Sequence, residues 1–108
     1  MTPTPGKRTR GSKTGRPIMA LLDLLGRRWA LRIVWELREG PLGFRTLQER
    51  CDGMSPSSLS LRLAELRHAG ILEEREEGGQ GLTAEGRTLI VAMTPMYAWA
   101  ERWASRAR

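Results

Sequence analysis

The stretch Ser55-Pro-Ser-Ser-Leu-Ser-Leu-Arg-Leu-Ala-Glu-Leu-Arg-His-Ala69, followed by Gly70, decides the fold. Ser55 favours a helix start because its hydroxyl can accept a hydrogen bond from a free backbone N–H, and Pro56 suits the first helical position. Gly70 is a natural helix end. At about 100° per residue, three leucines share one side of this helix, and a mostly small and polar set lies opposite. The leucines are Leu59, Leu63 and Leu66; the opposite side carries Ser57, Leu61, Ala64 and His68, flanked by Ser58 and Glu65.

Apolar residues at helical spacing predict four further helices. Gly and Pro punctuate them, because these residues end helices or bend them. The predicted helices span residues 17–25, ended by Gly26; 29–39, ended by Gly40-Pro41; 44–50, with Phe44 and Leu47 inward; and 84 to about 104, capped by Thr83 and kinked by Pro95.

A small β-hairpin is predicted after the helix over 55–69. Ile71–Arg75 and Gly81–Thr83 have the character of two short strands, and Gly78-Gly79 signals a two-residue hairpin turn between them. The piece Leu42-Gly43-Phe44 is long enough for only one strand-like pairing. Two helices joined by a tight turn and followed by a hairpin are typical of a winged helix-turn-helix, a mostly α fold with a small β-hairpin.

Positive charge is concentrated at the start of the chain. The chain has 108 residues and a net charge of +6, and residues 1–16 hold five of the 18 basic residues and none of the 12 acids. We expect residues 1–16 to be a disordered basic arm, and residues 17–108 to form one domain. The arm is suited to following phosphates or, alternatively, to keeping the chain in solution.

Several classes of protein are disfavoured by composition. No apolar run approaches the roughly 18 residues of a membrane span, and no signal-peptide pattern opens the chain, so we expect a cytoplasmic, nucleoid-associated protein with no membrane partner. With one cysteine, Cys51, and one histidine, His68, we expect no metal, no cofactor and no enzyme activity. Cys51 is interpreted as buried filler or, alternatively, a redox sensor, and His68 as a surface residue.

Three segments in this order resemble the HxlR family of winged-helix regulators, which are relatives of the MarR group. They are Pro17–Trp29, Gly40–Leu47, and Ser55–Leu66 with Ala69-Gly70-Ile71-Leu72 as its exit. Leu82-Thr83-Ala-Glu-Gly86-Arg87 and Trp99 also fall where the family places its last helix. The resemblance implies a transcriptional regulator that binds double-stranded DNA as a homodimer, at a pseudo-palindromic operator, through the helix over 55–69.

The chain departs from the family pattern in three places. Arg16 stands where family members often carry a sensing cysteine, and Ser57 where they often carry an arginine. The wing is short and acidic, so its carboxylates would repel phosphates. Arg16 removes the sensing chemistry from its position. The acidic wing and the missing arginine at Ser57 favour the alternative of a protein-interaction module that has lost sequence-specific DNA binding.

The expected DNA contacts lie on or beside the helix over 55–69. Ser57, Ser58 and Leu61 are placed to meet base edges, with Leu61 suited to a thymine methyl group. Phosphate contacts are expected from Ser55, Arg62, Arg67 and Arg45, and from Arg27 and Arg28 in the turn before residue 29. The alternative is a solvated helix face on which Arg62 pairs with Glu65.

The first and last helices are expected to form a dimer interface. In the family these two helices pair across a two-fold axis, and here they are too apolar for a short terminal helix to bury alone. The alternative is ordinary packing within one chain, and the sequence identifies no small-molecule effector. The expected interface residues are Ile18, Leu21, Leu22, Leu25, Met96, Trp99 and Trp103.

Overall fold

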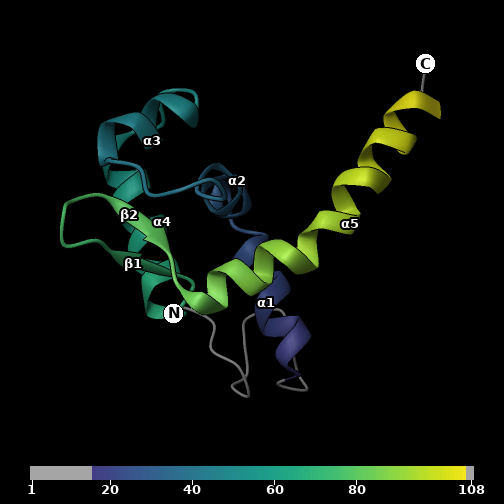
Figure 1. Ribbon diagram of the computed structural model, residues 1–108, viewed down its shortest axis with the longest axis horizontal. Helices are drawn as coiled ribbons and strands as arrows, with labels where there is room; N and C mark the ends of the chain where they lie inside the picture. The colour runs from purple at the N-terminus through teal and green to yellow at the C-terminus, as the bar shows by residue number, and fades with distance from the viewer. Residues whose placement is uncertain (1–15, 107–108) are drawn as a thin grey trace.

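Five helices and one hairpin make up the computed structural model, which describes residues 16–106. The predicted arm over residues 1–16 therefore falls outside the described residues, apart from Arg16. In chain order the elements are α1 (Pro17–Leu25), α2 (Ala30–Glu36), α3 (Phe44–Arg50), α4 (Pro56–His68), β1 (Leu72–Glu74), β2 (Gln80–Leu82) and α5 (Ala84–Arg106) (Figure 1). This is the winged helix-turn-helix order, and it confirms the predicted fold class.

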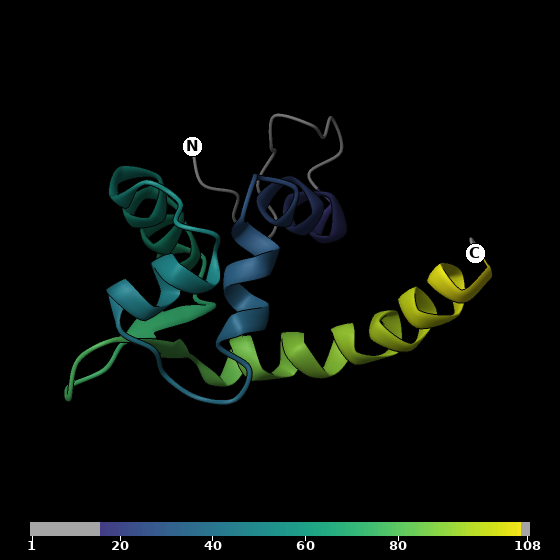
Figure 2. The same ribbon diagram turned by 90° about the horizontal axis from the view of Figure 1, so that it is seen from above.

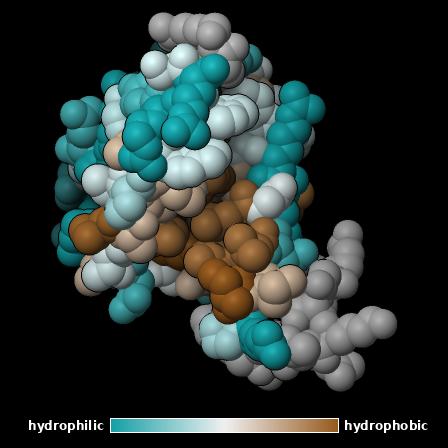
Figure 3. Space-filling model, turned by 90° about the vertical axis from the view of Figure 1, so that its right-hand side faces the viewer, coloured by the Kyte–Doolittle hydropathy of each residue, from teal (hydrophilic) through white to brown (hydrophobic). Residues whose placement is uncertain are grey.

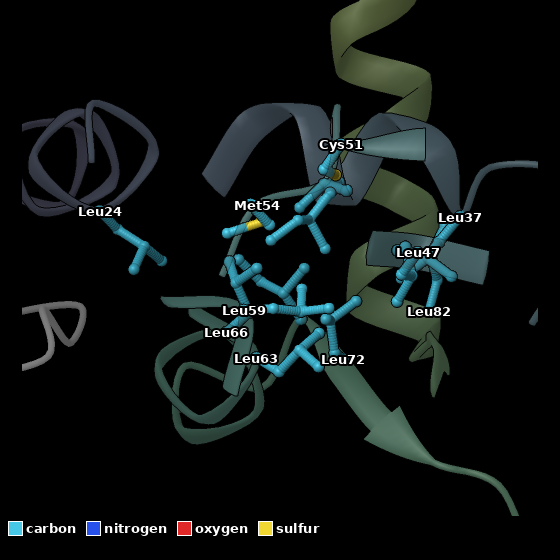
Figure 4. Packing of buried hydrophobic residues seen from close by; sticks show 13 residues of the cluster. Leu24, Leu37, Leu47, Cys51, Met54, Leu59, Leu63, Leu66, Leu72 and Leu82 are labelled. Carbon is cyan, nitrogen blue, oxygen red and sulfur yellow. The ribbon is translucent and has the colours of Figure 1, made fainter. Parts of the chain in front are cut away.

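The core gathers around the leucine side of α4, as its periodicity predicted. Leu59, Leu63 and Leu66 are buried, and Figure 4 shows them converging with Leu72 of the hairpin. Leu37, Leu47 and Leu82 form the adjoining part of the same cluster. Each fully buried leucine side chain contributes about 1.5–3 kcal/mol. The orientation of α4 is therefore set by its inner face.

The hairpin has a longer loop than predicted. Leu72 pairs with Leu82 and Glu74 with Gln80, so five residues lie between the paired ends. The N–H of Arg75 donates to the carbonyl of Gly79 at 3.0 Å, and the N–H of Gly78 donates to the carbonyl of Arg75 at 2.9 Å. The chain therefore turns over residues 76–78 and not in a two-residue turn at Gly78-Gly79. Leu42 adds the single predicted strand-like pairing, with Gln80.

Two further predictions were wrong in their details. Helix α2 ends at Glu36, because the backbone from Leu37 onward makes tighter i to i+3 turns instead of α-helical bonds. Trp29 lies outside the helix and adopts a left-handed backbone, with φ of 75°. Phe44 was expected inside, but it is 39% exposed, and the buried side chain of α3 is Leu47.

Helix α5 begins at a tightly held joint. The Thr83 hydroxyl accepts from the N–H of Gly86 at 3.0 Å and donates to the carbonyl of Gly70 at 2.6 Å, so it caps α5 as predicted. A Cβ on Gly86 would lie 2.3 Å from the carbonyl oxygen of Ile71, and only glycine permits this approach. The first turn of α5 is thus fixed against Gly70 and Ile71, which follow α4.

The second half of α5 leaves the rest of the domain. Both ribbon views show it extending beyond the other helices, and it bends along its length (Figures 1 and 2). Pro95 lies inside the helix and has no N–H, so it cannot bond to the carbonyl of Val91. The predicted kink has this physical cause.

No helix among residues 16–106 is long and apolar enough to cross a membrane.

The two sides of α4 should differ sharply in their effect on stability. We expect Leu59→Ala to lower the free energy of unfolding by about 2–5 kcal/mol, because it leaves a cavity in the core. Leu61→Ala, on the exposed side of the same helix, should change it by less than about 0.5 kcal/mol. Urea unfolding followed by circular dichroism measures both. Equal losses for the two variants would contradict the assigned orientation of α4.

Candidate nucleic-acid interface

The outward side of α4 is an uninterrupted exposed face. Ser57, Ser58, Ser60 and Ala64 are all exposed, and Leu61 is 54% exposed. This is the side that the sequence placed opposite the buried leucines. An isolated helix face of this width can enter the major groove of B-form DNA.

The start of α4 is organised by serine hydroxyls. The Ser55 Oγ accepts from the N–H of Ser58 at 3.2 Å and donates to the Ser58 Oγ at 2.9 Å. Pro56 follows at the first helical position. The predicted cap is confirmed, and it leaves the hydroxyls together at the positive end of the helix dipole.

The turn between α3 and α4 is compact because two residues take the left-handed conformation. Asp52 has φ of 55° and Gly53 has φ of 70°. The Gln48 side chain closes the turn, donating to the carbonyl of Met54 at 2.9 Å. This turn sets α3 against α4 as a helix-turn-helix pair.

A pocket of about 330 Å³ lies beside the start of α4. Arg28 is exposed at its edge and forms no ion pair with another residue in the range 16–106. The pocket thus combines the guanidinium groups of Arg28 and Arg62, two serine hydroxyls and a helix N-terminus, opposed by the carboxylate of Asp52. Its lining residues are Arg28, Trp29, Asp52, Met54, Ser55, Ser58 and Arg62.

Arg62 and Arg67, expected at phosphates, are both occupied within the protein. Arg62 donates through Nε to the carbonyl of Arg28 at 2.8 Å and through Nη1 to Glu65 at 2.9 Å. Arg67 donates to Gln80 at 3.1 Å and pairs with Glu74 at 3.8 Å. Pairing of Arg62 with Glu65 is the alternative that the sequence left open.

The two other arginine positions differ from one another. Arg45, the second residue of α3, is exposed and has no ion pair among the described residues. Arg27 is half-buried and lies between two carboxylates, Asp23 at 3.3 Å and Glu65 at 2.5 Å. The link from Arg27 to Glu65 was missed from sequence, because the two residues are 38 positions apart.

The wing presents carboxylates, as the sequence indicated. Glu73, Glu74, Glu76 and Glu77 are all exposed. Its one basic residue, Arg75, lies back on the hairpin, pairing with Glu73 at 2.8 Å and donating to the carbonyl of Leu82 at 2.9 Å. The tip of the wing therefore carries no exposed cation.

A second candidate surface is apolar and lies over α1 and α5. Figure 3 shows a broad hydrophobic area on the side toward which α5 extends. Leu21 and Leu25 are half-buried, and Tyr97 of α5 is exposed. The exposed residues that were expected here are Ile18, Leu22, Met96, Trp99 and Trp103.

A helix-turn-helix with a short wing and a long last helix defines the winged helix-turn-helix class of DNA-binding proteins. The chain belongs to the HxlR-like helix-turn-helix family, whose model matches residues 24–108. This confirms the resemblance found in the sequence. The chain is accordingly a DNA-binding transcriptional regulator of the HxlR type and not an enzyme.

Individual relatives agree with this assignment. YybR of Bacillus subtilis (strain 168), an HTH-type transcriptional regulator, is 30% identical over 83% of this chain and 77% of its own length. The quinone-bound structure of YodB from B. subtilis is 32% identical, covers 79% of this chain and 94% of its own, and has a TM-score of 0.72. A MarR-family structure from Enterococcus faecalis V583, 23% identical, covers 94% of this chain and 97% of its own with a TM-score of 0.74, and supports the fold.

Cys51 lies at the end of α3 and is fully buried. Burial raises the pKa of the Cys51 thiol, and nearby Arg32 acts in the opposite direction. Arg50 pairs with Glu36 at 3.6 Å. His68 is exposed, and no cluster of three metal-ligating side chains exists within residues 16–106.

The thiol of Cys51 should react slowly in the folded protein. Alkylation requires an accessible thiolate, and burial removes access while the raised pKa lowers the thiolate fraction near pH 7. We expect iodoacetamide to modify Cys51 at least about tenfold faster in 6 M urea than in buffer, with mass spectrometry as the measurement. Equal rates in the two conditions would restore the redox-sensor interpretation.

Proposed function

We propose that the chain binds double-stranded DNA as a homodimer, with α4 of each protomer in the major groove of one half of a pseudo-palindromic operator. The observation that carries this proposal is the exposed outer face of α4 above a fully buried inner face. Ser57 and Ser58 can donate to or accept from base edges, and Leu61 can contact a thymine methyl group. A protein acting on promoters would work in the cytoplasm, with the nucleoid.

Phosphate contacts are proposed at the two ends of the helix-turn-helix. At the start of α4, Ser55 and Arg28 adjoin the pocket of about 330 Å³, and the helix N-terminus adds its partial positive charge. Arg45 on α3 is the second free cation proposed for a phosphate. Arg62 and Arg67 are proposed to support α4 and the wing through their internal bonds, because reaching a phosphate would require breaking them.

The dimer is proposed to form through α1 and α5. Ile18, Leu22, Trp99 and Trp103 are more than half exposed, and a partner chain would remove this area from water. Half-buried Leu21 and Leu25, and exposed Met96, border the same surface. In a two-fold dimer the two α4 helices should lie about one DNA turn apart, roughly 34 Å.

A second candidate function is a protein-interaction module without sequence-specific DNA binding. The acidic wing favours it, because Glu73, Glu74, Glu76 and Glu77 would repel the DNA backbone. Salt dependence separates the two functions, since phosphate contacts make log K fall with log salt concentration.

DNA binding should depend on Leu61 and Arg45 in different ways. After selecting duplexes from a random pool with the wild-type chain, we expect Leu61→Ala to lower affinity for the selected duplex by about tenfold, and for random duplexes little. Arg45→Ala should weaken both kinds of duplex similarly and reduce the salt slope by about one. Fluorescence anisotropy at two salt concentrations measures these values.

Arg38→Ala, at an exposed position after α2 and outside α1, α3, α4 and α5, removes the same charge and serves as the control for Arg45→Ala. It should leave the salt slope unchanged. A wild-type chain whose binding to duplex DNA is absent or insensitive to salt would refute the proposed function in favour of the interaction module.

The dimer should be lost on placing a charge in the apolar surface. We expect sedimentation equilibrium to show a dimer at micromolar concentration for the wild type, and a monomer for Leu22→Glu, because burying an unpaired carboxylate is costly. Leu61→Glu is the matched control, since Leu61 is 54% exposed and Leu22 is 56% exposed. A wild-type monomer, or dissociation by both variants, would count against α1 as interface.

A further inference from the structure

A cluster of charged side chains joins the first helix to the recognition helix. Glu65 of α4 uses both carboxylate oxygens: Oε2 accepts from Arg27 at 2.5 Å and Oε1 from Arg62 at 2.9 Å. Arg27 also pairs with Asp23 of α1 at 3.3 Å. The Glu65 side chain is only 14% exposed, so these ion pairs are better shielded from water than ordinary surface pairs.

The same cluster holds a strained turn. Arg62 donates through Nε to the carbonyl of Arg28, and the next residue, Trp29, has φ of 75°. A bulky residue in this left-handed region costs on the order of 1 kcal/mol and persists only where its surroundings fix it. The turn between α1 and α2 is thus held directly by a side chain of α4.

We propose that Glu65, with Arg27 and Arg62, is a positioning group that fixes the angle between α1 and the recognition helix. This inference rests on the proposed function, in which α1 lies at the dimer interface. If α1 sets where the partner sits and Glu65 sets how α4 is held against α1, the cluster determines the distance between the two α4 helices. Glu65 would then select the operator spacing without touching DNA.

A purely electrostatic role for Glu65 makes a different prediction. Loss of its negative charge would release Arg62 toward phosphates, so affinity would rise at every spacing and the salt slope would steepen. A positioning role instead predicts that the preference for one spacing weakens. One extra base pair rotates a half-site by about one tenth of a turn, so spacing is a sensitive measure of the angle.

The experiment compares variants on duplexes that carry two inverted copies of the half-site selected by the wild type, with spacers altered by one and two base pairs. We expect the wild type to prefer its best spacer by about tenfold or more, and Glu65→Gln to reduce this preference to about threefold or less. Arg27→Met roughly keeps the length of the side chain and should reduce the spacing preference in the same way as Glu65→Gln. The Arg27→Met, Glu65→Gln double variant should lose no more of the spacing preference than the single variants, because each of the three proteins lacks the Arg27–Glu65 ion pair.

Glu36→Gln is the matched control. Glu36 also lies between two arginines, Arg32 and Arg50, and is 15% exposed, but it joins α2 to α3. The Glu36→Gln variant should keep the wild-type spacing preference. Its melting temperature, measured by circular dichroism, should fall by about as much as that of Glu65→Gln. The proposal is overturned if Glu65→Gln and Arg27→Met, each shown to be folded, keep the wild-type spacing profile, or if Glu36→Gln loses it equally. A wild type that binds duplexes without any spacing preference overturns the positioning role and leaves DNA binding intact, whereas a wild type that binds no duplex overturns the proposed function as well.

Discussion

Burial of Leu59, Leu63 and Leu66 is the constraint on which the rest of the structure depends. Because an α-helix places residues at fixed angles, turning these three side chains inward leaves no freedom for the opposite face. The Ser55 cap then sets where that face begins, and the hydrophobic energy of the core holds it outward. The surface proposed to meet DNA is therefore a consequence of core packing, and it requires no separate stabilisation.

The arginines around α4 fall into two groups, those that support the fold and those that are free to contact a ligand. Arg27, Arg62 and Arg67 are bound to acceptors within the protein, whereas Arg28 and Arg45 remain exposed beside the helix-turn-helix. Exposed carboxylates occupy the wing. A polyanion approaching this side meets attraction at the start of α4 and repulsion at the wing, so the charge distribution favours one orientation of the domain over DNA.

Local signals made most of the fold predictable, and long-range pairing made the rest unpredictable. Ser55, Pro56 and Gly70 define α4 because caps and stops act within a few residues. The prediction that Phe44 points inward was wrong, because the side chain of Leu47 already occupies the core under this helix of two turns. The expected exposure of Leu61 followed from periodicity, but the Arg27–Glu65 contact joins residues 38 positions apart, and nothing local encodes it.

Helix α5 carries the part of the apolar surface for which we propose a partner chain. Its first half is anchored, with Leu89 and Met93 packed on the core, and just beyond Pro95 Tyr97 stacks on Trp35 of α2 with ring centroids 5.8 Å apart. The rest of the helix then extends beyond the other elements. Trp99 and Trp103 stack with ring centroids 5.8 Å apart, and they remain more than half exposed. A core that is complete without these rings gains nothing from them, and their exposed area costs free energy in water. The proposed partner chain over α1 and α5 would remove that cost, and through Asp23, Arg27 and Glu65 the same contact would reach the recognition helix.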